Sequence, residues 1–252
     1  MKISAAIILI LFSISSISQV NTEKFRQDQD SIGFTAKISA GFSVKTGNSD
    51  YQLIDGDGRL NFNGGNYYTF LVFKSEFGWT NGKQFSNESL VHLRYVPSLS
   101  EDLQLEVFAQ MDYDKSRLLL FRDLFGAGLR IKALKYEGYK LRVGSALMYE
   151  QEKYDLPVMA IHETKASVFR WTNYLSNEID LHDNLKLLSI VYYQPQINKF
   201  NDVRILSENT LDISVSKNLS FYIRYNLRYD SKPPDGKAQT DSKSKFGVTI
   251  KF

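Results

Sequence analysis

The sequence predicts an all-β protein: a transmembrane antiparallel up-and-down β-barrel of about 12 strands. Three observations support this prediction. An apolar segment typical of exported proteins opens the chain, apolar and polar side chains alternate from Ser31 onward, and many alternating segments reach a length that can cross a bilayer. A chain of 252 residues fits one large all-β domain. Its 17 Phe and 15 Tyr suit pleated, half-buried surfaces.

The N-terminal segment has the features of a secretory signal. Lys2 precedes an apolar run from Ile3 to Ile17, and Ser16 and Ser18 supply small residues for a signal peptidase. The run of about 15 residues is shorter than the roughly 20 that a membrane-spanning helix needs. We predict a signal peptide over residues 1–18 with cleavage after Ser18, a polar periplasmic leader over 19–31, and a barrel domain over 32–252.

The first expected strand, Ile32–Lys45, shows the two-residue period clearly. Phe34, Ile38 and Phe42 lie on one face, and Lys37 and Ser43 lie on the other. A helix would place its apolar residues three and four positions apart, so this segment is a strand. Later segments repeat the alternation, most clearly at Leu219–Asp230. In chain order the remaining expected strands are Tyr51–Asn63, Asn66–Thr80, Ser86–Val96, Leu103–Asp114, Leu118–Leu134, Tyr139–Glu152, Val168–Leu181, Leu185–Pro195, Val203–Val215, Leu219–Asp230 and Lys243–Phe252.

The connections between these strands alternate in length. One set is short and consists of Gly64-Gly65, Pro97–Asp102, Lys135–Gly138, His182–Asn184 and Ser216–Asn218. The other set contains the longest gaps, Lys153–Ser167 and Ser231–Ser242. Outer-membrane barrels have short periplasmic turns and longer outer loops, so both termini are expected in the periplasm.

A soluble β-sandwich also alternates apolar and polar residues, and a periplasmic ligand-binding β-protein is therefore the alternative fold. Strand length favours the barrel, because soluble strands average about 5–6 residues. Aromatic residues also gather at strand ends, as at Tyr67, Trp79, Tyr149 and Tyr229. Such girdles are typical of membrane–water interfaces.

The last seven residues, Phe246–Phe252, alternate strictly and end on Phe. This pattern places four apolar side chains toward lipid and predicts that the final strand closes the barrel against the first. It also resembles the C-terminal signature by which the outer-membrane assembly machinery recognises its clients. We therefore expect outer-membrane lipids and this machinery as partners.

Several strings resemble a known family. They are Gly47-Asn48, Phe121–Arg130, Tyr192–Pro195, Asp202–Arg204 and Asp230–Pro234. The chain is similar over residues 33–252 to YdiY-like proteins, which are described as salt-induced outer-membrane proteins and classed as a domain of unknown function. Ser49 stands where that family more often has Thr. The motifs are glycine and turn patterns, so the resemblance implies a location and a fold but no reaction.

Charge gives one candidate binding site. The net charge is +3 without blocks of like charge, which does not favour nucleic acid. Alternation turns Arg130, Lys132, Lys140 and Arg142 inward near the turn at Lys135–Gly138. This basic patch could attract a small anion or solute, or dock the polar leader. The alternative is a ladder of Arg–carboxylate pairs that fills the lumen, because inward acids include Glu106, Asp112, Asp114, Glu150, Glu152, Glu178, Asp180, Glu208 and Asp212.

The sequence predicts no catalytic, cofactor-binding or metal site. His92 lies close to Ser89 in sequence, and a phospholipase-like hydrolase would need such a pair, but alternation points His92 into the lumen. Carboxylates in Asp55–Gly58 lack the further oxygens of a calcium loop. We therefore expect a structural, envelope-stress or narrow-pore barrel without catalysis in the outer membrane. A lipid hydrolase and a small-solute or anion channel remain alternatives.

Overall fold

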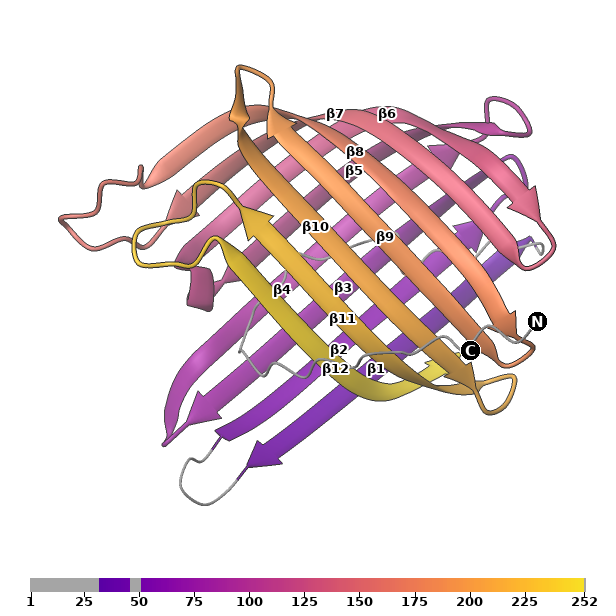
Figure 1. Cartoon of the computed structure of the whole chain (residues 1–252), viewed down its shortest axis with the longest axis horizontal. Helices are drawn as coiled ribbons and strands as arrows, with labels where there is room; N and C mark the ends of the chain where they lie inside the picture. The colour runs from indigo at the N-terminus through magenta and orange to yellow at the C-terminus, as the bar shows by residue number, and fades with distance from the viewer. Residues whose placement is uncertain (1–31, 46–50, 252) are drawn as a thin grey trace, which may run out of the picture.

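The computed structural model describes residues 32–45 and 51–251, which form a closed antiparallel barrel (Figure 1). The expected signal peptide, the leader and Phe252 lie outside the described residues. The strands are β1 (Gly33–Lys45), β2 (Tyr51–Asn63), β3 (Tyr67–Thr80), β4 (Lys83–Pro97), β5 (Leu103–Asp114), β6 (Leu119–Tyr136), β7 (Tyr139–Tyr154), β8 (Lys165–His182), β9 (Leu185–Gln196), β10 (Lys199–Ser214), β11 (Leu219–Asp230) and β12 (Thr240–Lys251), with a 3-10 turn η2 (Lys115–Arg117) after β5.

Each strand pairs with its neighbours in the chain, and β12 pairs with β1. In this closing ladder Ile38 lies opposite Ile250, and Ala40 lies opposite Val248. The predicted closure of the first and last strands is therefore confirmed. A closed barrel satisfies the backbone hydrogen bonds of all its strands and leaves no edge exposed to hydrocarbon.

The twelve expected strands are all present, and several extend further than the alternation of hydrophobicity predicts. β8 begins at Lys165 instead of Val168, and β10 begins at Lys199 instead of Val203. Backbone pairing continues beyond the apolar band of these strands. Outside that band both faces tolerate polar residues, so the sequence pattern disappears before the hydrogen bonds do.

The barrel exposes its apolar side chains and buries its charged ones. Phe42, Met111 and Phe125 are 69%, 65% and 62% exposed, whereas Arg122 and Glu150 are fully buried in the interior. A soluble sandwich would have the opposite arrangement, because its apolar face forms the core. This exterior therefore suits the hydrocarbon of a bilayer. None of the described residues forms a helix long and apolar enough to cross a membrane.

The connections distinguish the two ends of the barrel. We call the end where β1 begins and β12 ends the inner end, and the opposite end the outer end. The two longest described loops, residues 155–164 and 231–239, both leave the outer end, away from the C-terminus (Figure 1). The outer end also has a two-residue turn at Asn81-Gly82, where φ is positive at both positions (47° and 72°) as a tight hairpin requires.

Aromatic rings on the inner face lie over glycines of a neighbouring strand. Tyr174 of β8 covers Gly144 of β7, and Phe108 of β5 covers Gly126 of β6. A Cβ atom at either glycine would lie closer than 3.0 Å to the facing ring. The glycines therefore let large rings lie flat against the wall and narrow the middle of the lumen.

Candidate functional site: the polar lumen

The lumen of the barrel contains a buried ion-pair cluster near its outer end, centred on Glu150 of β7. Its Oε1 atom lies 3.0 Å from Nε of Arg170 and 2.7 Å from Nη1 of Arg204. Its Oε2 atom pairs with Arg122. Glu152, two residues further along β7, lies 2.9 Å from Arg204 and 3.4 Å from Arg122. We call these five residues the Glu150 cluster.

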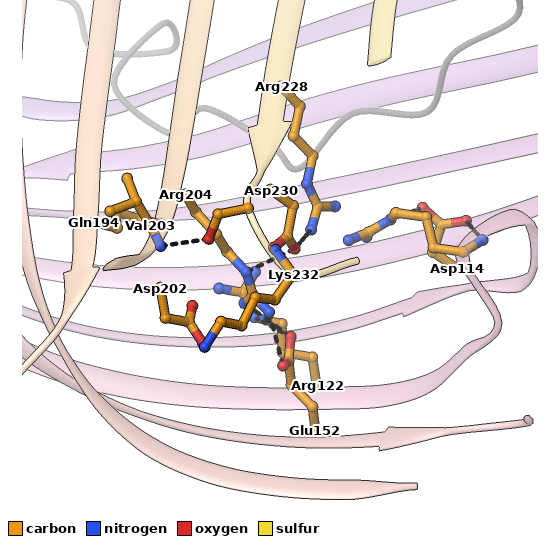
Figure 2. A network of polar contacts seen from close by, with 12 residues as sticks. Asp114, Arg122, Glu152, Gln194, Asp202, Val203, Arg204, Arg228, Asp230 and Lys232 are labelled. Atoms are coloured by element: carbon orange, nitrogen blue, oxygen red, sulfur yellow. Dashed lines mark hydrogen bonds and ion pairs between the residues drawn. The ribbon is translucent and has the colours of Figure 1, made fainter. Parts of the chain in front are cut away.

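Further carboxylates extend the Glu150 cluster around the outer mouth (Figure 2). Arg204 lies 3.0 Å from Asp230, which also lies 3.2 Å from Arg228. Arg170 reaches Asp202 at 3.0 Å, and Arg122 lies 3.5 Å from Asp112. Alternation placed Asp112, Glu150 and Glu152 inward but did not single out Asp202, Asp230 or these arginines. Arg122, Arg170 and Arg204 occupy even-numbered positions on β6, β8 and β10. The same two-residue alternation that turned the acids inward would therefore have placed these arginines in the lumen.

A second set of ion pairs joins β12 to β2 and β3 across β1. Glu76 pairs with Lys243 and lies 3.1 Å from Lys245, and Lys245 lies 2.8 Å from Asp55. Arg224 of β11 lies 3.2 Å from Asp57 of β2. Both members of each pair are largely buried. These contacts connect strands two or three steps apart around the wall, so they brace the barrel across its lumen.

Two residues of the predicted basic patch, Arg130 and Lys132, lie on β6 near the inner end. Arg130 is 1% exposed and donates to Tyr68 Oη at 2.9 Å and to Gln104 Oε1 at 3.1 Å. Lys132 is half-buried and donates to the Glu101 carbonyl in the β4–β5 turn at 2.8 Å. These donations connect β6 to β3 and β5 and to the β4–β5 turn.

The other two residues of the patch, Lys140 and Arg142, share Glu178 of β8 with Lys186 of β9. The distances to the Glu178 carboxylate are 3.7 Å, 3.3 Å and 2.7 Å respectively. Lys132 and Arg142 are register partners in the backbone, yet their side chains reach toward different neighbours. The four residues therefore lie at the same end of the lumen but form two groups.

Cations outnumber carboxylates at this end. We compared the inward-facing side chains among the last five residues of each strand at the inner end. The cations there include Lys37, Arg59, Arg94, Lys132, Lys140, Arg142 and Lys186. The carboxylates there are Glu106, Glu178, Asp180 and Asp212. The outer half instead combines its arginines and lysines with a larger number of acids. Among the inward-facing residues of the strands, the balance of charge thus differs between the two ends.

Apolar and aromatic side chains narrow the lumen between these charged zones. The rings of Phe70, His92 and Phe108 stack along the wall with centroids 6.0 Å and 6.1 Å apart. A cavity of about 40 Å³ lies beside them, lined partly by Met148 and Leu206. This volume accommodates a small number of water molecules.

The histidines occupy separate places. His92 is buried in the lumen, where Arg94 donates to it at 3.2 Å, whereas Ser89 lies on the outer face of the same strand. The His–Ser pair that a hydrolase would need does not form between these residues. His162 lies in the outer loop 155–164 and contacts Tyr154, and His182 lies at the inner end of β8 beside Asn184.

The carboxylates in Asp55–Gly58 are engaged by cations. Asp55 contacts Lys245, and Asp57 contacts Arg224. Over residues 32–45 and 51–251, no three His, Cys, Asp or Glu side chains are grouped as a metal site would require. The polar groups of the lumen can therefore hold a rigid wall or guide ions.

Comparisons with known proteins agree with this fold. The family model described as "Protein of unknown function, DUF481" matches residues 38–252. Among solved structures, the NanC porin is 13% identical, covers 86% of this chain and 100% of its own, and has a TM-score of 0.50. The KdgM porin in complex with disordered oligogalacturonate is 11% identical, with coverages of 87% and 99% and a TM-score of 0.47. No curated protein matches the chain.

Proposed function

This chain belongs to the family of proteins of unknown function DUF481, and from its lumen we propose that it is an outer-membrane barrel with a structural or narrow-pore role in the envelope and without catalysis. The observation that carries the proposal is the Glu150 cluster, in which three arginines and two glutamates meet inside the barrel. Such pairs hold the wall in one shape and occupy the space that a wide channel would need.

The inner end supports a second candidate, a narrow path that favours small anions. Glu178 pairs with three cations, Lys140, Arg142 and Lys186. Asp180 lies 3.3 Å from Lys186, so this group holds three cations and two carboxylates. Arg130 and Lys132 of β6 add two more cations at this end. A basic vestibule raises the local concentration of anions.

Conductance of purified protein in planar bilayers tests both candidates. We expect conductance steps well below those of an open general porin, or none, and no uptake of sugars in liposome swelling. Sugar uptake would contradict the narrow lumen. If small steps occur, the reversal potential should favour anions, and the Lys132→Glu/Lys140→Glu variant should shift it toward cations. Lys83→Glu, at the exposed first residue of β4 at the outer end, is the matched control. An unchanged selectivity in the double variant would contradict the anion path.

The expected processing and location have their own measurements. N-terminal sequencing of the exported protein should begin at Gln19, and the protein should fractionate with the outer membrane and migrate heat-modifiably on a denaturing gel. The salt-induced character implied by the resemblance predicts higher abundance at raised salt. Lipase activity that disappears in His92→Ala would contradict a role without catalysis.

A further inference from the structure

Polar side chains form a patch on the lipid-facing wall of strands β7 to β10. We define the lipid-facing polar patch as Ser145, Asn173, Asn177, Ser189, Ser207 and Asn209, all at outward positions. Backbone register aligns three of them in a row across β8, β9 and β10, because Asn177 is the partner of Ser189 and Ser189 is the partner of Asn209. The row is therefore a continuous feature of the barrel exterior.

The row lies inside the apolar band of the barrel. Along β8, Asn177 is flanked by the outward residues Leu175 and Ile179, and Leu181 follows further toward the inner end. Along β9, Ser189 lies between Leu187 and Val191. Apolar side chains thus continue on both sides of the row, which places its amides at hydrocarbon depth and away from the headgroups.

The patch satisfies only part of its own hydrogen-bonding capacity. Ser189 Oγ donates to Asn209 Oδ1 at 2.7 Å, and Asn209 Nδ2 donates to Ser207 Oγ at 3.3 Å. Asn177 accepts from Tyr139 Oη at 2.9 Å, and its amide nitrogen donates to none of the described residues. Lipid tails offer neither donors nor acceptors, so this amide gains a partner only from another polar surface.

We propose that the lipid-facing polar patch is the contact between two copies of this chain in the membrane. Asparagine side chains both donate and accept, so the patch can pair with itself across a two-fold axis. All copies insert in the same direction and present the row at the same depth. An axis along the membrane normal therefore brings the two rows together, with Ser189 near the centre. Asparagine and serine act in the same way between membrane-embedded helices.

The absence of Cys from the sequence permits a clean cross-linking test in native membranes. Ser189→Cys should give a dimer with a short bis-maleimide, whereas Ser75→Cys should remain monomeric. Ser75 is the matched control because it faces outward in the middle of β3, on another part of the wall. Absence of the Ser189→Cys dimer, or equal cross-linking through Ser75→Cys, would overturn the proposal.

A second measurement addresses the hydrogen bonds themselves. In detergent micelles or lipid discs, light scattering should give the mass of two chains for the wild-type protein. Asn177→Leu/Asn209→Leu should raise the dissociation constant about tenfold, since a hydrogen bond between membrane segments changes affinity by about threefold on average. A heat-modifiable gel shift establishes that the variant is folded. A wild-type monomer, or a folded variant that dimerises as tightly as wild type, would refute the interface.

Discussion

Replacing Glu150 by Gln removes the charge at the centre of the Glu150 cluster while keeping the shape of the side chain. Glu150 is fully buried and faces Arg122, Arg170 and Arg204. Removing one partner of a buried ion pair costs about 3–5 kcal/mol, because the remaining charge is left uncompensated. Here Glu152 still contacts two of the arginines, so the lower value of about 3 kcal/mol applies.

The expected loss lowers the ratio of folded to unfolded protein by about two orders of magnitude. Urea titration in lipid vesicles, followed by tryptophan fluorescence and by heat-modifiable migration, measures it as a lower midpoint with an unchanged slope. Glu163→Gln, at an exposed position of the outer loop, is the control and should change stability by less than about 0.5 kcal/mol. If Glu150→Gln also changes stability by less than about 0.5 kcal/mol, the arginines do not depend on the shared carboxylate, and the role of the Glu150 cluster in holding the wall is wrong.

Two further predictions concern the wall and the loops. Gly144→Ala places a methyl group against the Tyr174 ring and should cost about 1–3 kcal/mol in the same titration, whereas Gly56→Ala, with its nearest neighbour at 3.6 Å, should cost less; equal losses would contradict the close approach. Asp235 accepts a hydrogen bond from the His162 backbone N–H at 2.7 Å, which holds the pKa of this carboxyl below its ordinary value of 3.8. The contact is therefore complete above pH 3.8 and is lost as the pH falls through the lowered pKa. Limited proteolysis of the outer loops should accelerate only below pH 3.8, and Asp235→Asn should abolish this acid dependence; a rate that already rises near neutral pH would contradict the prediction.

Alternation of side chains determined most of the architecture before any contact was known. A period of two residues assigns each side chain to one face of a strand, so the number of strands and the inward acids such as Glu150 and Glu178 followed from the sequence. The alternation of short and long connections likewise predicted that one end of the barrel carries short turns and the other carries the long loops. The strand bounds were less accurate where both faces become polar, as at the outer end of β8.

The partners of each charge depended on the tertiary structure. Alternation gives the face but not the depth, because the tilt and stagger of the strands decide which residues share a level of the barrel. Arg204 and Glu152 are 52 residues apart and meet at 2.9 Å, while Lys132 and Arg142 are adjacent in register and contact different groups. The same stagger aligns Asn177, Ser189 and Asn209 into one row. The sequence by itself therefore determined which side chains face lipid or lumen, and only the closed barrel decided which of them meet.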